Sequence, residues 1–283
     1  MWKILGSACL TLGIAVAHAA PLGTVTVADG RAHLVRGTTI LAVAEGVTAE
    51  EGDLLDLEEG ALVQIETTTG SALSFTARAQ ALLPQAVGGR TSDLVLASGW
   101  SKFTLASAAQ VPSVAAPNLR LLSQPATYVL GAGADSTQLF VEAGELVPVF
   151  ATAKAGQPAV VKSNEYVSVK ADATFALAAR APQAFVAAMP KIYRDKLPQR
   201  AAQLKARGVP AKAERELAFA DVDGWFKRFP AARAQFAEQF RPLLADKDFL
   251  RELEPRIKDF PEWESAIKPD KKGAKGKPAA KGK

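Results

Sequence analysis

The chain has 283 residues, a 48% hydrophobic content and a formal net charge of +5. This apolar content is enough for one large or two ordinary cores, which excludes a generally disordered protein. No basic stripe interleaved with aromatic residues runs through the chain, which argues against a nucleic-acid-binding protein.

The first twenty residues predict a secretory signal peptide. Lys3 supplies a positive start, residues 4–16 form an apolar run, and Ala17-His18-Ala19 gives the small-x-small pattern of a cleavage site. The run is shorter than the roughly 20 apolar residues of a membrane-spanning helix. We therefore expect export to the periplasm, cleavage after Ala19 or Ala20, and a mature form without a transmembrane span.

Cys9 is the only cysteine and lies inside this apolar run. Cleavage would leave a mature chain with neither disulfides nor a thiol nucleophile. The residues before it, Gly6-Ser7-Ala8, make a poor lipobox, so lipid anchoring is the less favoured alternative.

Residues 21–181 predict an all-β sandwich or β-roll. Apolar residues alternate with period two, and turn signals separate these stretches at the spacing of short strands. The alternating pairs are Val25 and Val27, Val63 and Ile65, Leu73 and Phe75, Leu139 and Val141, and Val167 and Val169. We assign structural turn roles to Gly52, Asp53, Gly70 and Gly144. The Ala-, Ser-, Val- and Pro-rich stretch 106–117 divides the module into two possible halves, 21–105 and 118–181.

Residues 182–267 predict a small α-helical region. Apolar residues recur at helical spacing, as in Val222, Trp225, Phe226 and Phe229 and again in Phe236, Phe240, Leu243 and Leu244. Asp221 and Asp246 stand where N-caps are expected. The aromatic stripe is compatible with a partner-binding face, but burial in the chain's own core is favoured.

The basic charge is concentrated at the C-terminus. Residues 20–181 hold 10 Lys/Arg against 15 Asp/Glu, residues 182–267 hold 16 against 13, and residues 268–283 hold 7 against 1. The last segment predicts a disordered tail that binds anionic envelope lipids or polymers, with a merely solubilising role as the alternative. Its candidate binding residues are Lys268, Lys271, Lys272, Lys275, Lys277, Lys281 and Lys283.

A series of glycine-centred motifs resembles the FecR family across roughly residues 23–170. The motifs are Gly23-x-Val25-x-Val27-x-x-Gly30-x-Ala32, Gly52-Asp53, Gly60-Ala61-x-Val63-x-Ile65, Gly70-Ser71-x-Leu73-x-Phe75, Gly99-Trp100-x-Lys102-Phe103 and Leu139-Phe140-Val141-x-x-Gly144-Glu145-Leu146. The resemblance implies a periplasmic all-β module, which in the family's founding members is a sensor that relays transporter occupancy to a sigma factor.

The chain departs from the family plan at its N-terminus, where a cleavable signal stands in place of a cytoplasmic segment and an internal membrane span. We therefore interpret it as a non-catalytic periplasmic module that binds or scaffolds envelope components. Its expected partner is an envelope protein, an anionic polymer or a lipid surface, and no nucleic acid. A sensor that acts through a membrane partner is the first alternative. The ligand and the oligomeric state stay open.

Catalytic and metal-binding patterns are absent from the sequence. His33 is the only histidine outside the signal segment. A single histidine is too few for a zinc site, and in practice it also argues against Ser-His-Asp catalysis. No phosphate-binding glycine loop or nucleophile elbow occurs, so we expect no enzyme, no cofactor and no metal. A glycan hydrolase is the remaining alternative, and it would draw its carboxylates from Glu50, Glu51, Asp53, Asp56, Glu58 and Glu59.

Overall fold

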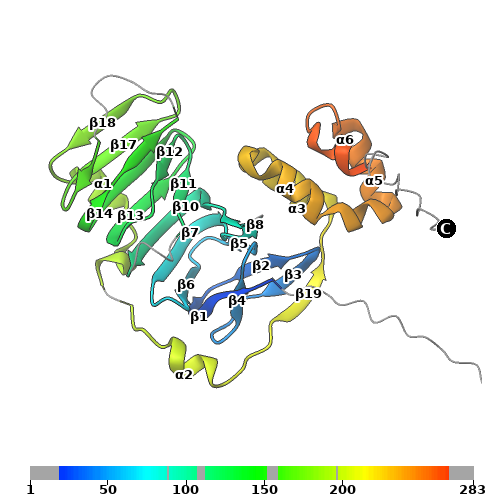
Figure 1. Ribbon diagram of the computed structural model, residues 1–283, viewed down its shortest axis with the longest axis horizontal. Helices are drawn as coiled ribbons and strands as arrows, with labels where there is room; N and C mark the ends of the chain where they lie inside the picture. The colour runs from blue at the N-terminus through cyan, green and yellow to red at the C-terminus, as the bar shows by residue number, and fades with distance from the viewer. Residues whose placement is uncertain (1–18, 88, 107–111, 152–158, 196, 268–283) are drawn as a thin grey trace, which may run out of the picture.

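The computed structural model describes residues 19–87, 89–106, 112–151, 159–195 and 197–267. A body of β-strands is followed by short helices, which confirms the predicted fold class (Figure 1). The helices α3 to α6 gather at one end of this body, and β17 and β18 lie at the other.

The strands of the first half are short apart from β7. They are β1 (Pro21–Asp29), β2 (Ala32–Arg36), β3 (Thr39–Ala42), β4 (Thr48–Glu50), β5 (Leu54–Leu57), β6 (Leu62–Thr67), β7 (Ala72–Leu82), β8 (Ala86–Val87) and β9 (Arg90–Thr91). The second half contains β10 (Leu94–Leu105), β11 (Val114–Ala116), β12 (Leu119–Leu121), β13 (Ala126–Ala132), β14 (Ser136–Leu146), β15 (Pro148–Phe150), β16 (Val161–Lys162), β17 (Tyr166–Lys170) and β18 (Phe175–Ala178).

Helices and one further strand follow β18. They are α1 (Gln183–Ala188), α2 (Ala201–Lys205), β19 (Lys212–Glu216), α3 (Phe219–Arg228), α4 (Arg233–Gln239), α5 (Lys247–Leu253) and α6 (Glu262–Ile267). Short 3₁₀ helices cover Lys191–Arg194, Pro230–Ala232, Arg241–Ala245 and Glu254–Arg256. No helix among the described residues is long and apolar enough to cross a membrane.

Two long strands, β7 and β10, connect the parts of one large sheet. The first part of β7 pairs with β6 and its last part pairs with β5, while β10 lies antiparallel along both parts. The bend in β7 falls at Ala77 and Arg78, two consecutive non-glycine residues with φ of +55° and +59°. Gly99 of β10 lies at the same corner, and a Cβ there would come within 2.4 Å of the Ala79 Cα atom. The corner therefore requires a residue without a side chain at position 99.

The main core is one cluster that joins the two predicted halves. The inward residues Val63, Ile65, Phe75, Leu139 and Val141 are fully buried within it. Val27 is an exception to the predicted alternation because the register of β1 against β6 shifts between Val25 and Val27. The shift buries Thr26 completely in its place.

After β18 the chain returns across the outer face of the sheet toward the first half. We call residues 182–195 and 197–211 the return segment, and Figure 1 shows it passing through α1 and α2 to β19. The prediction of a purely helical region after residue 181 is wrong at β19, which pairs antiparallel with β3. All five residues of β19 are exposed, so no apolar alternation marked the strand, and its pairing with the edge of β3 defines it.

The helices α3 to α6 form a second core against the sheet. Trp225, Phe226 and Phe236 are at most 4% exposed, and they pack with Val35 and Leu54 from the strands. The aromatic stripe is therefore buried in the chain's own core, as predicted. These helices cover the outer face beside the second part of β7, where Leu82 joins the same cluster.

Two local predictions need correction. Asp221 is not the N-cap of α3, because the helix begins after Ala218 and the Asp221 carboxylate accepts a hydrogen bond from the Ala218 backbone N–H. Gly144 is not in a turn but inside β14, where its φ of +83° accompanies a shift in register against β13. Asp246 does cap α5, since its carboxylate accepts from the backbone N–H groups of Asp248 and Phe249.

Replacing Gly99 by Ala should destabilise the module much more than the same change at Gly70. Both glycines have a similar positive φ, +86° and +83°, but only position 99 lacks space for a Cβ. We expect Gly70→Ala to cost about 1 kcal/mol from backbone strain, and Gly99→Ala to cost at least about 2 kcal/mol more. Urea unfolding followed by circular dichroism measures both costs, and equal costs would contradict this account of the corner.

Candidate functional site

The candidate site is a cleft between the outer face of the sheet and the return segment. It encloses about 480 Å³. Polar side chains supply much of its lining: Gln64, Ser74, Lys102, Thr104, Thr127 and Glu142 from the strands, and Tyr193, Asp195 and Gln199 from the return segment. We call it the strapped cleft.

The strand register places the polar side chains of the cleft in two neighbouring rows across the sheet. Ser74 of β7 lies opposite Gln64 of β6 on one side and Lys102 of β10 on the other. One step along the strands, Thr104 of β10 lies opposite Thr127 of β13. Because side chains alternate between faces, these residues point outward while their neighbours enter the core.

An ion pair lies in the cleft. The Lys102 Nζ is 2.9 Å from Glu142 Oε2, and the two side chains are only 14% and 28% exposed. Lys102 also donates a hydrogen bond of 2.5 Å to the backbone carbonyl of Tyr193 in the return segment. An ammonium has three N–H donors, so these two contacts leave it able to donate once more to a ligand.

Hydrogen bonds at both ends of the cleft hold the return segment on the sheet. The Tyr193 hydroxyl lies within hydrogen-bond distance of the backbone carbonyls of Ser74 and Trp100, at 3.1 and 3.0 Å. Burial raises the pKa of Tyr193 well above its ordinary value, so the hydroxyl stays a donor. Near the other end, the side-chain amide of Gln64 donates to the carbonyl of Pro198.

Arg200 fixes the return segment where the cleft ends. Its backbone N–H donates to the Glu66 carboxylate at 2.7 Å, and its guanidinium contacts both the Thr26 carbonyl and Glu45. Glu66 is only 7% exposed and also accepts from the backbone N–H of Ala201. The attachment is therefore polar in this part, in contrast to the aromatic packing of the helices.

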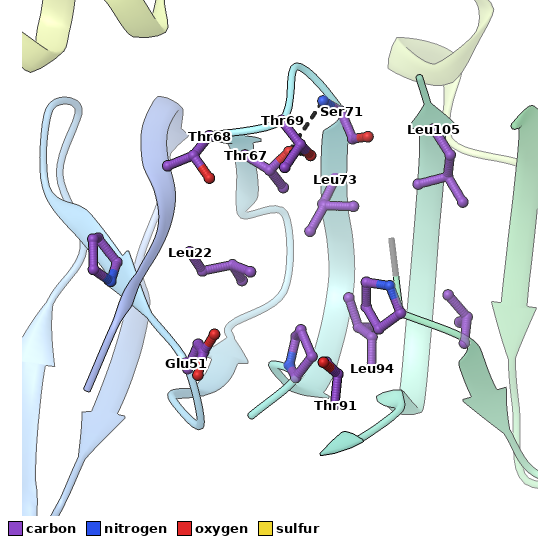
Figure 2. Close-up of a pocket in the computed structure, with 14 residues that line it drawn as sticks. Leu22, Glu51, Thr67, Thr68, Thr69, Ser71, Leu73, Thr91, Leu94 and Leu105 are labelled. Carbon is purple, nitrogen blue, oxygen red and sulfur yellow. Dashed lines mark hydrogen bonds between the residues drawn. The ribbon is translucent and has the colours of Figure 1, made fainter. Parts of the chain in front are cut away.

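A second, smaller pocket lies on the β body (Figure 2). It encloses about 170 Å³ over an apolar floor that includes Leu22, Leu73 and Leu94. Its rim carries hydroxyls from Thr67, Thr68, Thr69, Ser71 and Thr91. The Thr67 hydroxyl accepts from the Ser71 backbone N–H and lies 2.8 Å from the Thr69 hydroxyl, so part of the rim is engaged in closing its own turn. We call this the threonine-rimmed pocket.

The acidic residues of the hydrolase alternative do not gather in one place. Glu51 lines the threonine-rimmed pocket, whereas Asp56, Glu58 and Glu59 line a shallow pocket beside the β7 corner. Glu58 and Glu59 have side chains that are 56% and 78% exposed, and each pairs with an arginine. A glycosidase needs two carboxyl groups on either side of one substrate-binding pocket, and these side chains do not line one pocket together with Glu51. The expectation of no enzyme activity stays a prediction.

Asp53 and Glu50 belong to an internal ion-pair network. Asp53 is 1% exposed and receives two hydrogen bonds from the Arg36 guanidinium, at 2.9 and 2.7 Å. Burial raises the pKa of Asp53, while the bonds from Arg36 and from the Glu50 backbone N–H act in the opposite direction. Gly52 precedes it with a φ of +79°, and Gly70 has a φ of +83° between β6 and β7. These residues shape turns and line no part of the strapped cleft.

The other sequence-based candidates are placed as follows. His33 lies on β2, with its Nδ1 atom 3.1 Å from Glu214 Oε2 of β19. No group of three or more possible ligands for a metal ion occurs among the described residues. The seven lysines from Lys268 to Lys283 lie outside the described residues.

The strapped cleft was not predicted from the sequence. Lys102 was named only as part of a glycine-tryptophan motif, and Gln64, Thr104 and Thr127 were not candidates. The available signal was the polar residue at each outward position of neighbouring strands. That signal needs the register and the path of the return segment, and neither follows from the alternation of one strand.

Comparison with known proteins assigns the chain to no family. No protein-family model and no curated protein matches the chain. Two solved structures are similar in part, both described as "a putative anti-sigma factor from Parabacteroides distasonis ATCC 8503", at 1.65 and 2.50 Å resolution. They are 11% and 13% identical, with TM-scores of 0.38 and 0.39, over 47% of this chain. This chain covers 63% and 62% of theirs, less than two thirds of their length. The likeness is too weak to assign a function, and the FecR resemblance stays a prediction.

Removing the Tyr193 hydroxyl should loosen the return segment without unfolding the module. Tyr193→Phe loses the contact with two buried carbonyls, which we expect to cost about 1–2 kcal/mol. Hydrogen exchange should then become faster in residues 191–201. Tyr128→Phe is the matched control, because its ring is equally buried but lies in the main core. Equal exchange in both variants would show that the hydroxyl does not hold the segment.

Proposed function

We propose that this chain is an exported, non-catalytic module that binds an envelope polymer through the strapped cleft. The observation that carries the proposal is the cleft itself, a hollow of about 480 Å³ with hydrogen-bonding groups from both the sheet and the return segment. Amides, hydroxyls and a single ion pair are the groups that bind a ligand carrying both hydroxyl and amide functions. The proposal assigns these groups to binding and not to catalysis.

The chemistry of the lining favours a neutral or zwitterionic polymer in the cleft. Lys102 is already paired with Glu142, and Asp195 adds a further carboxylate, so the cleft has no excess of positive charge. An anionic lipid would find no cluster of cations there. Peptidoglycan combines a glycan with short peptides and so offers the hydroxyls, amides and paired charges that the lining can match.

Thr104 and Thr127, which lie opposite each other in the cleft, provide a direct test with purified peptidoglycan sacculi. Thr104→Val and Thr127→Val together remove two hydroxyls and keep the side-chain volume and the anchors of the return segment. We expect at least about a fivefold loss in sacculus binding, as each lost hydrogen bond costs about 1 kcal/mol. Co-sedimentation with sacculi measures the binding.

Thr68→Val is the matched control for this experiment, because Thr68 is exposed on the rim of the other pocket. It should bind sacculi as well as the unchanged chain. If the native chain fails to bind sacculi or soluble muropeptides, the proposal is wrong. If Thr68→Val alone reduces binding, the threonine-rimmed pocket is the site instead.

The lysine tail is proposed as a separate tether to anionic membrane surfaces. Residues 268–283 carry seven lysines and one acidic residue, and each lysine contributes about 1 kcal/mol near an anionic bilayer. Truncation after Ile267 should abolish binding to vesicles that contain anionic phospholipid and leave sacculus binding unchanged. Vesicle flotation at low and high salt measures the first effect. Binding to vesicles that survives the truncation would contradict the tether.

A further inference from the structure

A hollow beside Trp100 lies apart from the strapped cleft. It encloses about 260 Å³. Trp100 of β10 lies opposite Gly131 of β13, and Gly131 in turn lies opposite Gln138 of β14. The turn between β13 and β14 adds Asp135 to the lining, and the start of β14 adds Ser136. None of these residues lines the strapped cleft. We call this site the tryptophan hollow.

The indole ring of Trp100 lies flat on the sheet. A Cβ atom at Gly131 would lie 3.2 to 3.3 Å from three consecutive atoms of the six-membered ring, Cε3, Cζ3 and Cη2. Such similar distances mean that Gly131 faces the plane of the ring and not its edge. Phe185 of α1 packs against the indole with ring centroids 5.4 Å apart, and it is only 3% exposed. The ring is therefore a platform that is held in place by its neighbours.

The polar groups around this platform are free to bind a ligand. Among the residues that the structure describes, the indole N–H of Trp100 and the carboxylate of Asp135 have no hydrogen-bond or ion-pair partner. The side-chain amide of Gln138 lies 3.5 Å from the Ser136 hydroxyl, which is a long contact. The Asp135 backbone is fixed, because its carbonyl accepts from the Ala171 N–H at 2.9 Å. The hollow thus presents both donors and acceptors beside an aromatic ring.

We propose that the tryptophan hollow binds one neutral pyranose ring of a glycan. The C–H groups on the face of a pyranose carry partial positive charge, and the face of an aromatic ring carries partial negative charge, so the two stack. Each sugar hydroxyl both donates and accepts, which matches the indole N–H, the amide and the carboxylate. The volume is below the roughly 300–1,000 Å³ of pockets for drug-sized ligands, so it suits a single ring. The site is additional to the function proposed for the strapped cleft.

The charges of the lining favour a neutral sugar over a charged ligand. Asp135 is the one ionisable residue of the lining, and an anionic sugar or a phosphate would meet its carboxylate without a compensating cation. An ammonium ion could lie over the indole ring and pair with Asp135. It would leave the donors of Trp100 and Gln138 without acceptors, whereas sugar hydroxyls satisfy them.

Titration of the isotope-labelled full chain with two neutral trisaccharides tests the proposal by nuclear magnetic resonance. The indole N–H signal of Trp100 is the one that Trp100→Phe removes, and it should shift on addition of sugar. Cellotriose and tri-N-acetylchitotriose are the probes. A shift with both supports recognition of the pyranose ring itself. A shift with the acetylated sugar alone supports the proposal with a glycan of the peptidoglycan type as the source.

Asp135→Asn should weaken trisaccharide binding at least about fivefold, because a neutral amide replaces a charged acceptor. Asp135 is exposed in a turn, so the folded state should tolerate the change. Glu145→Gln is the matched control, since it removes the same charge from an exposed position of β14 outside the hollow. The control should bind the trisaccharide as well as the unchanged chain.

Three results would overturn the proposal. The first is no shift of the Trp100 signal with either trisaccharide, and the second is a shift with choline but with neither sugar. The third is equal affinity of the Asp135→Asn and Glu145→Gln chains. The chain carrying Thr104→Val and Thr127→Val should keep the Trp100 shift, because those threonines line only the strapped cleft. Failure of sacculus binding at the cleft and failure of sugar binding at Trp100 are therefore distinguished.

Discussion

The close approach of Gly99 to the backbone of Ala79 is the constraint on which the arrangement of the module depends. It allows β7 and β10 to bend together, so that β7 pairs with β6 before the bend and with β5 after it. On one side of the corner, their outer faces lie under the helices α3 to α6. On the other side, they lie under the return segment. A single glycine contact thus separates the part of the sheet that is covered by aromatic packing from the part that carries the polar rows.

The two coverings differ in kind. The helices bury Trp225, Phe226 and Phe236 against the strands in an apolar core. The return segment has an apolar cluster around Phe185 and Tyr193 and packs again on the main core at Val209 and Ala211. Between these places it is hydrogen-bonded to Gln64 and Glu66. Because these contacts hold the return segment on either side of the cleft, a gap is left between the segment and the polar residues of the sheet.

The sequence predicted the fold class because alternation and helical spacing are local signals. Val63 with Ile65 and Leu139 with Val141 enter the core as their spacing indicated, and the stripe from Val222 to Phe229 is buried. Val27 was mispredicted because a shift in register depends on the partner strand. β19 was missed because its five exposed residues have no apolar pattern, and its pairing with β3 spans a long separation in the chain.

The candidate site was beyond the reach of local patterns for a related reason. Gln64, Lys102, Thr127 and Tyr193 come from four separate elements and meet only when the sheet has its register and the return segment has its path. The acidic cluster was the charged candidate site in the sequence, yet Asp53 accepts a hydrogen bond from Arg36 and Glu58 forms an ion pair with Arg31. Uncharged polar residues at outward strand positions, Gln64, Thr104 and Thr127, supply part of the lining.

The contact between Arg200 and the Thr26 carbonyl spans 174 residues of chain. If the protein crosses a membrane from its N-terminus, the first strand emerges long before the residue that completes its surroundings. The strands would then emerge first, and the side chains of Gln64 and Glu66 would stay exposed to water until the return segment emerges. Completion of the cleft would in this sense be a late step, which follows the emergence of the strands β1 to β18 and precedes that of the helices α3 to α6.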